Sequence, residues 1–402
     1  MPNHEMVGRT GKLSFLEGGR ALMALNVLLC HFVIVYYPQM YYLDYAREKG
    51  GFLSLFATTG LSALVNGNIA VQFFLLLTGF LVGKTFFTKP VDAHEIPSRA
   101  WKRYVRLFPV VCASTLVAFG TMVLGLKPHL NAADLVGNHS ILLDYNNFEP
   151  SLFSLAVNIF VDPYCKNGSS YVGPFWVICY EFWGYVLAMI LCVIFRNRKH
   201  RHLEYPLAAF LCLNNLNMYY VAVVLGVFLA DLSYNPAPGC MDGFFHGWLR
   251  RKPVVYGLLA IGTVLACCPQ YYTSIYAVLE PIPYMELVAV RAVGLACVMF
   301  SVLQMPRVQR VLSHPLLLWL GEYSFEIYGI HWPVMLTFET WLFSGLLSVM
   351  GYDMAAILAL IVTLPVILAC AVVMRLAIRW VTPYGNRLVH FAARTLRGRF
   401  CN

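Results

Sequence analysis

The sequence is poor in charged residues. Only 12% of its 402 residues are Asp, Glu, Lys or Arg, about half of the roughly 25% found in a soluble globular domain. Because 59% of the residues are hydrophobic and the mean hydropathy is +0.65, too few polar side chains remain to cover a water-exposed surface. The composition therefore excludes an ordinary soluble domain and predicts an all-α, polytopic integral membrane protein.

Other signals are missing as well. The 12 cysteines form no CxxC pair and no Cys/His spacing typical of a metal site, so no metal is expected. We find no cleavable signal peptide before the first apolar run. We also find no internal repeat and no inverted pair of Gly- or Pro-interrupted helices, which are typical of transporters.

About ten apolar runs have the length or composition of membrane-spanning helices. They lie at 21–37, 69–88, 107–126, 175–195, 204–216, 218–232, 254–268, 284–304, 315–343 and 353–381. With a cytoplasmic N-terminus, 24 of the 29 Lys and Arg residues fall in segments expected inside, four in outer loops, and Arg291 within a span. This asymmetry follows the positive-inside rule, so both termini are expected in the cytoplasm. The net charge of +9 is thereby explained without nucleic acid.

The expected organisation is a cytoplasmic tail at 1–13, a membrane domain at 14–382 and a basic cytoplasmic tail at 383–402. No soluble domain is expected after the last span.

The first span begins in the stretch SFLEGGRALMALNVLLCHF, residues 14–32, and carries two polar groups that hydrocarbon disfavours. Arg20 and His31 are eleven residues apart, close to three helical turns, so they share one face about 16 Å apart along the axis. A molecule with a negative head and a reactive tail could bridge them. The alternative is an arginine that sets topology and a histidine bonded to a neighbouring helix.

A basic face precedes the third span. In SRAWKRYVRLFPVV, residues 98–111, Arg99, Arg103 and Arg106 recur at i, i+4 and i+7 and therefore lie on one side of a helix. Guanidinium groups bind phosphate in a bidentate manner, so this face suits a phosphate-rich cytosolic ligand. An anchor for lipid headgroups is the competing interpretation.

The fourth span contains a carboxyl group. Glu181 lies seven residues into PFWVICYEFWGY, residues 174–185, and such a group must be protonated or paired. A functional role is favoured, and a structural partner such as Arg291 remains open.

The ninth span starts with LGEYSFEIYGIHWPV, residues 320–334. Ser324, Tyr328 and His331 fall on one helical face, and the Trp332-Pro333 pair predicts an interruption. These side chains either line a substrate path or form a structural hydrogen-bond cluster. In the second span, the Thr78-Gly79 pair predicts close contact between helices.

Five stretches in this order resemble the sequence elements of membrane-bound acyltransferase family 3, whose polytopic members O-acylate surface sugars and related acceptors. They are LEGGRALMALNVLLCHF, NIAVQFFLLLTGFLV, RYVRLFP, WVICYEFWGY and YSFEIYGIHWPV. The resemblance covers roughly residues 14–382. Glu17, Gly19, Ala21 and Thr78 depart mildly from the family's usual residues, whereas the arginine and histidine positions are intact.

The resemblance implies the catalytic candidates. His31 falls on the family's catalytic histidine, acting as a general base or as a transiently acylated relay. Glu181 and His331 fall on two further polar positions and are expected to take part.

The resemblance also implies the donor. Arg103 and Arg106 fall on an arginine pair proposed to bind acyl-CoA, and Arg20 and Arg99 are expected to join them. The donor is expected to be acetyl-CoA or another short acyl-CoA.

The acceptor is expected to be a carbohydrate or lipid-linked saccharide at the cell surface, and the location the plasma membrane, among membrane lipids. Without the secreted hydrolase-like domain that some members carry, the chain is expected to act alone.

Two other functions remain. A transporter or flippase of polar lipids or sugars would use Arg20, Glu181, Arg291 and His331 to line its path, and a non-catalytic scaffold or sensor would need none of them for chemistry. Consumption of a thioester by the purified protein would separate the enzyme from the transporter, whereas a scaffold predicts that replacing His31 and His331 leaves the phenotype intact.

Overall fold

The computed structural model describes residues 13–89, 91–137, 139–281 and 286–400. It is 80% helical, and these residues contain no strand, so the all-α prediction is confirmed. The longer helices are α1 Ser14–Tyr36, α4 Gly67–Thr88, α5 Ile96–Val123, α10 Trp176–Phe195, α11 Arg201–Leu211, α12 Tyr220–Tyr234, α13 Lys252–Ala266, α14 Leu287–Val302, α17 Ser324–Val334 and α19 Tyr352–Phe400. The shorter ones are α2 Leu43–Lys49, α3 Ser54–Thr58, α6 Pro128–Val136, α7 His139–Asp144, α8 Leu152–Phe160, α9 Asp162–Cys165, α15 Pro306–Leu312, α16 Pro315–Glu322 and α18 Thr340–Leu347.

Membrane-spanning helices are present, but the expected count of about ten is not confirmed. Five segments of the described chain are long and apolar enough to cross a membrane, and they are Ser14–Tyr36, Gly67–Thr88, Ala93–Val123, Gly173–Phe195 and Tyr352–Trp380. A sixth results if α14 and α15, bent by 105° at their junction, are counted together. The other apolar runs form shorter helices, such as α12 and α13 with 15 residues each, below the roughly 20 residues of a straight crossing.

The interruption expected at Trp332-Pro333 is present only as a change of helix type, because α17 continues through Pro333 and the break in this run lies earlier, at Tyr323. The run 315–343 forms α16, α17, a π-helical turn at Met335–Glu339 and α18 in place of one rod. Pro333 lies inside α17, and because proline has no amide hydrogen it removes one rung of the helical ladder. The π-helical turn follows directly after α17.

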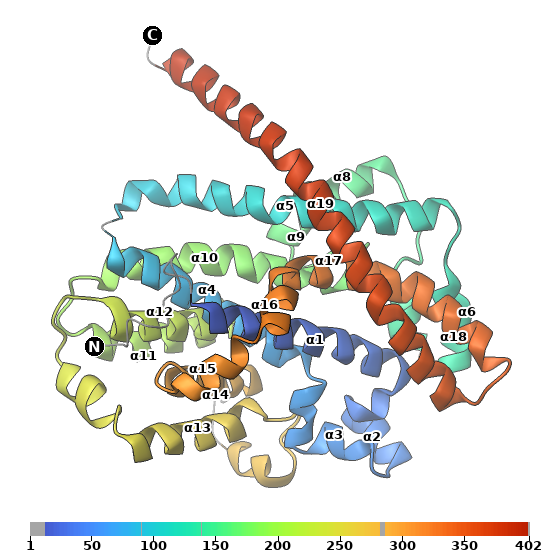
Figure 1. Ribbon diagram of the computed structural model, residues 1–402, viewed down its shortest axis with the longest axis horizontal. Coiled ribbons are helices and arrows are strands. Elements are labelled where there is room, and N and C mark those ends of the chain that lie inside the picture. The colour runs from blue at the N-terminus through green and yellow to red at the C-terminus, as the bar shows by residue number, and fades with distance from the viewer. Residues whose placement is uncertain (1–12, 90, 138, 282–285, 401–402) are drawn as a thin grey trace.

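The bundle is arranged around α4, which contacts α1, α10, α12 and α14. In Figure 1, α1, α4, α10 and α12 run alongside one another, α5 follows one edge, and α19 crosses the bundle obliquely. The short helices α2, α3, α6 and α18 gather at the end where α1 finishes. α17 packs against α1, α5 and α19, so the last third of the chain returns to the first.

Glycines allow α4 and α12 to approach closely. A Cβ atom on Gly79 would collide with the backbone carbonyl of Val223, and one on Gly226 with the carbonyl of Leu76. The structural role predicted for Gly79 is therefore confirmed.

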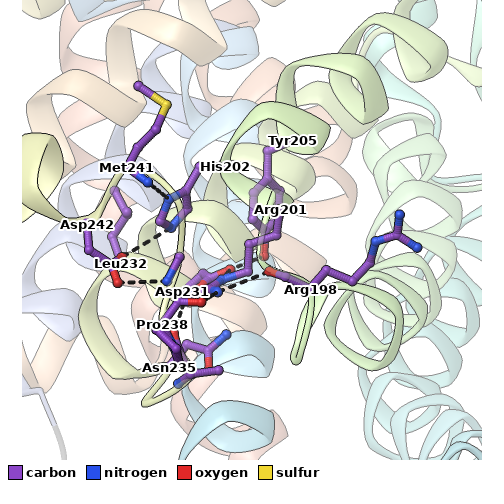
Figure 2. Close-up of polar contacts among 12 residues, drawn as sticks. Arg198, Arg201, His202, Tyr205, Asp231, Leu232, Asn235, Pro238, Met241 and Asp242 are labelled. Atoms are coloured by element: carbon purple, nitrogen blue, oxygen red, sulfur yellow. Dashed lines mark hydrogen bonds and ion pairs between the residues drawn. The ribbon is translucent and has the colours of Figure 1, made fainter.

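A buried ion pair fixes the loop that follows α12. Nε of Arg201 donates to both carboxylate oxygens of Asp231 at 2.9 Å, and Tyr205 donates its hydroxyl hydrogen to the same group at 2.8 Å. The remaining guanidinium nitrogens donate to the carbonyl oxygens of Arg198, Ala237 and Pro238. Figure 2 shows how these contacts hold the loop against α11.

The proposed structural pairing of Glu181 with Arg291 is wrong. The guanidinium of Arg291 is buried and donates to the carbonyl oxygens of Cys268 and Pro269, whereas Glu181 has a different partner, described below.

The domain boundaries expected at 13/14 and 382/383 stay a prediction. Residues 1–12 of the expected N-terminal tail lie outside the described residues. At the other end, α19 continues without a break through 382 and 383.

Candidate active site

Helices α1 and α17 bring two histidines together. Nε2 of His331 lies 3.1 Å from Nδ1 of His31, and the ring centroids are 5.0 Å apart. The indole of Trp332 lies edge-on to His31, 5.1 Å between centroids. His331 is buried, whereas His31 keeps part of its surface exposed.

Backbone carbonyls set the direction of the contact between the two rings. Nδ1 of His331 lies 2.7 Å from the carbonyl oxygen of Tyr328, so this nitrogen carries the hydrogen, and Nε2 of the neutral ring is an acceptor. Nδ1 of His31 must then be the donor, shared between His331 and the carbonyl oxygen of Val27 at 2.9 Å. Nε2 of His31 keeps its lone pair and has no hydrogen-bond partner among the described residues.

This arrangement gives His31 the properties of a general base. Its Nε2 lone pair is available, and the hydrogen on the opposite nitrogen is held by two acceptors that would stabilise the protonated ring. His331 contacts Nδ1, the ring nitrogen of His31 opposite the free lone pair, and is therefore a positioning residue.

A cavity of about 540 Å³ lies between α1, α4, α5, α10, α17 and α19. Its charged wall residues are Glu17, Arg20, Arg103, Arg106, Glu181, Glu322, Glu326, Arg375 and Arg379. Apolar wall residues include Phe74, Leu77, Leu107, Val110, Val177 and Ile178. The volume is within the range of small-molecule binding sites.

Three of the five guanidinium groups on the wall are occupied by carboxylates. The pairs are Arg103–Glu181 at 2.7 Å, Arg20–Glu17 at 3.0 Å and Arg375–Glu326 at 3.6 Å. Arg106 and Arg379 are exposed and make no hydrogen bond or ion pair with any described residue. The wall thus combines three arginines in ion pairs with two that make no ion pair within the described part of the chain.

Glu181 contacts neither histidine. Its carboxylate accepts hydrogen bonds from Arg103 and, at 2.8 Å, from Thr78. Its visible role is to hold Arg103 in place on the cavity wall. Neither Glu181 nor Glu322 orients His31, because the described partners of its Nδ1 are a carbonyl oxygen and His331.

The four arginines expected to bind the donor are not all in one place. Arg20, Arg103 and Arg106 line the cavity. Arg99 is not among its wall residues and bonds to Glu95 at 2.9 Å, with its guanidinium over the ring of Phe86.

Tyr328 links the cavity to the histidine pair. It is a wall residue, its ring centroid lies 5.9 Å from that of His331, and its hydroxyl donates to the carbonyl of Pro174. Neither histidine is itself a wall residue. On α17, His331 follows Tyr328 by three residues, close to one helical turn.

Sequence reasoning missed Arg375 and Arg379 as site residues. They are four residues apart in MRLAIRW, near the end of the last apolar run, and so share one helical face. The positive-inside rule accounts for them as topogenic charges, although the same kind of spacing draws attention to Arg99 and Arg103.

A comparison with protein families decides the identity. The acyltransferase domain model of acyltransferase family 3 matches residues 13–376, which is most of the chain. The chain belongs to acyltransferase family 3. A search of curated proteins found no match, and a search of solved structures found none.

The protein is therefore a membrane acyltransferase, as the resemblance predicted. The family match includes both histidines, Glu181 and four of the five arginines of the wall, and it ends three residues before Arg379. Within the described part of this acyltransferase, no group of three or more His, Cys, Asp or Glu residues could hold a metal ion.

Proposed function

We propose that this acyltransferase moves an acetyl or other short acyl group from cytoplasmic acyl-CoA to a hydroxyl group of a carbohydrate or lipid-linked saccharide at the surface of the plasma membrane. The observation that carries the proposal is the contact of 3.1 Å between His31 and His331, one helical turn from a cavity rich in guanidinium groups. A base with a free lone pair and a cation-lined cavity are what transfer from an acyl-CoA to a hydroxyl uses.

The donor would enter the cavity with its phosphates toward the start of α1, where Glu17 and Arg20 lie on the wall. Arg20 and His31 are separated by about 16 Å along the helix axis. A pantetheine arm reaching along α1 would place its thioester near His31. Tyr328 would have to turn aside, since its ring forms the wall on the side of His331.

The chemical step would begin at Nε2 of His31. This nitrogen takes the proton of the acceptor hydroxyl while the oxygen attacks the thioester carbonyl carbon. The bond from carbon to sulfur then breaks, and the departing thiolate takes the proton back from His31. The products are an ester and free CoA, and the base is regenerated.

A relay is the second form of the same proposal. Nε2 of His31 could attack the thioester carbonyl carbon itself and expel the CoA thiolate, so that the ring carries the acyl group. An acceptor hydroxyl arriving from the outer side would then attack this acyl group, the bond from carbon to Nε2 would break, and the released hydroxyl proton would balance the charge of the thiolate. Both forms of the proposal need substrate access to His31, and its partly exposed side chain is consistent with that access.

The test uses purified full-length protein in lipid nanodiscs, with release of free CoA measured against acetyl-CoA and a saccharide acceptor. We expect CoA release in the wild type and its loss in His31→Ala. Mass analysis of surface glycans from cells with and without the gene should show the matching acetyl increment. Wild-type turnover in His31→Ala would contradict the mechanism, and absence of CoA release in the wild type would contradict the choice of donor.

A further inference from the structure

Aromatic rings and amide side chains meet where α4, α10 and α12 begin. The ring centroids of Trp176 and Tyr219 are 5.2 Å apart, and the ring of Tyr180 lies 5.8 Å from Trp176 and 4.9 Å from Tyr219. Asn68 connects α4 to these rings, because its side-chain oxygen accepts a hydrogen bond of 2.9 Å from the Tyr219 hydroxyl. The side-chain nitrogen of Asn68 donates to the side-chain oxygen of Gln270 at 3.3 Å.

A buried amide continues this group along α4. Gln72 follows Asn68 by four residues, so the two side chains share one face of the helix. Gln72 is 0% exposed, and neither its side-chain nitrogen nor its side-chain oxygen has a hydrogen-bond partner among the described residues. A buried amide in this state is destabilising unless a polar ligand or water completes it. The aromatic–amide cluster comprises Asn68, Gln72, Trp176, Tyr180, Tyr219 and Gln270.

The cluster keeps hydrogens that no described residue accepts. The Tyr180 hydroxyl oxygen accepts hydrogen bonds from the amides of Asn167 at 3.3 Å and Asn217 at 3.2 Å, so its own hydrogen is available to a ligand. The side-chain nitrogen of Gln270 and the indole nitrogen of Trp176 also donate to no described residue. Both of these side chains are partly exposed.

The buried Arg291 fixes the position of Gln270. Its guanidinium donates to the carbonyl oxygens of Cys268 and Pro269, the two residues directly before Gln270. A cation inside an apolar bundle is unfavourable without a role. Here it holds the backbone of the turn that presents the Gln270 amide to Asn68.

The cluster adjoins the helix that carries His31. Gly67, directly before Asn68, packs against Cys30, because a Cβ atom on Gly67 would lie 3.2 Å from the Cys30 sulfur. Cys30 is the residue directly before His31. With the N-terminus expected in the cytoplasm, α1 crosses outward and α4 begins at the outer side, where a surface acceptor is expected.

The cluster also adjoins the helix that carries His331. The carbonyl oxygen of Pro174, two residues before Trp176, accepts the hydroxyl hydrogen of Tyr328, whose ring lies 5.9 Å from that of His331. Both histidine-bearing helices therefore contact the backbone beside the cluster, although its six side chains are not wall residues of the cavity.

We propose that the aromatic–amide cluster binds a sugar ring of the acceptor. This inference rests on the proposed function and gives the acceptor a site separate from the donor cavity. The face of an aromatic ring is electronegative and attracts the C–H groups on one face of a pyranose. Sugar hydroxyls both donate and accept hydrogen bonds, as amide side chains do. The six side chains carry no charge, so the cluster suits a neutral sugar in preference to an anion.

The experiment separates acceptor binding from donor binding. Full-length protein in lipid nanodiscs is assayed for CoA release with acetyl-CoA and with oligosaccharides released from the surface glycans of the cells that carry the gene and freed of esters by mild alkali. The variants are Trp176→Leu, Trp176→Phe and Gln270→Leu. Trp341→Leu is the matched control, because Trp341 is a tryptophan of α18 that is 61% exposed and lies outside the cluster.

We expect the half-saturating concentration of oligosaccharide to rise about tenfold in Trp176→Leu and Gln270→Leu, while that of acetyl-CoA stays the same. Trp176→Phe keeps a ring and should recover most of the affinity, and Trp341→Leu should match the wild type. Binding without turnover is measured in His31→Ala, where added oligosaccharide should change the tryptophan fluorescence. The change should shrink when Trp176→Phe is introduced into the same protein.

Unchanged oligosaccharide affinity in Trp176→Leu and Gln270→Leu, with melting temperatures near that of the wild type, would overturn the sugar site. An equal loss in Trp341→Leu would also overturn it, because Trp176 would then be one of the aromatic residues that anchor the bundle at the membrane surface. If Trp176→Leu does not fold, Gln270→Leu decides alone. A wild type that releases no CoA would contradict the proposed function, and the fluorescence titration would still decide whether the cluster binds sugar.

Discussion

His331 holds its Nε2 atom 3.1 Å from Nδ1 of His31, although 300 positions separate them in the chain. The carbonyl oxygen of Tyr328 fixes which nitrogen of His331 carries hydrogen. Because the other nitrogen of His331 must then accept, this contact also fixes which nitrogen of His31 carries hydrogen. The outcome is a base with one free lone pair, supported from behind by a second imidazole.

The first prediction concerns the two histidines. His31→Ala should lower turnover by about 10²- to 10⁴-fold, the usual contribution of a general base. His331→Ala should cost less, on the order of tenfold, because Nδ1 of His31 still donates to the carbonyl of Val27. Steady-state rates of CoA release measure both. His94, whose side chain is 80% exposed, supplies the control variant, and an equal loss in His94→Ala would contradict the assignment.

The second prediction concerns Arg103 and Glu181. Their side chains are only 18% and 11% exposed and meet at 2.7 Å, so removing either partner leaves a charge poorly solvated. Arg103→Gln and Glu181→Gln should each lower the free energy of unfolding by about 1–3 kcal/mol, and the double variant by less than their sum. A double-mutant cycle from denaturation in detergent tests this. Strict additivity would mean that the pair contributes no coupling.

The third prediction compares two ion pairs of one region. Asp231→Asn should destabilise the protein by about 3–5 kcal/mol, since it leaves the buried guanidinium of Arg201 without its partner. Glu204→Gln breaks the neighbouring pair with Arg198, whose side chain is 59% exposed, and should cost less than about 1 kcal/mol. Thermal unfolding of both variants is the measurement. Equal losses would contradict the difference in burial between the two ion pairs.

The fourth prediction concerns glycine. Gly79→Ala should destabilise strongly, because the new Cβ atom meets the carbonyl of Val223 and forces α4 and α12 apart. At Gly257, inside α13, a Cβ atom would have no neighbouring atom within 4 Å, so Gly257→Ala should be neutral or stabilise by about 0.5–1 kcal/mol. The two melting temperatures should therefore move in opposite directions or differ by several degrees.

The fifth prediction concerns pH. Burial, with help from the charge of Arg201, lowers the pKa of His202 below its ordinary value of 6.5, although Asp231 and Asp242 oppose the shift. Above pH 6.5 the ring of His202 is neutral in both the folded and the unfolded state, so its titration does not lower the stability of the protein. As pH falls below 6.5 the unfolded chain takes up the proton first, so stability declines toward the lowered pKa.

Melting temperatures of the wild type and His202→Gln at pH 7.5 and 5.5 measure this effect. The acid-induced drop should be smaller in His202→Gln, while His94→Gln, which changes an exposed ring, should behave like the wild type. A drop of the same size in His202→Gln would exclude this residue as the cause. His129, whose pKa is also lowered by burial, acts in the same direction, so part of the drop should remain.

Much of the site could be recognised from single residues in unfavourable surroundings. An arginine and a histidine in one apolar span, a carboxyl group in another and a histidine before a proline each stand out because hydrocarbon does not tolerate them without a role. The same reasoning did not foresee that Arg99, which shares a helical face with Arg103, pairs with Glu95 and is not among the wall residues of the cavity. It also failed for Arg379, whose charge had a sufficient explanation in topology.

The sequence by itself determined that the protein is helical and lies in a membrane, because composition and backbone chemistry act locally. It also sufficed for the family, because ordered motifs are a property of the chain alone. Only the tertiary structure decided which side chains contact one another. The packing of distant helices decides which guanidinium contacts Glu181, which atom lies next to His31 and which arginines make no ion pair. Spacing along one helix carries no information about the helices that pack against it.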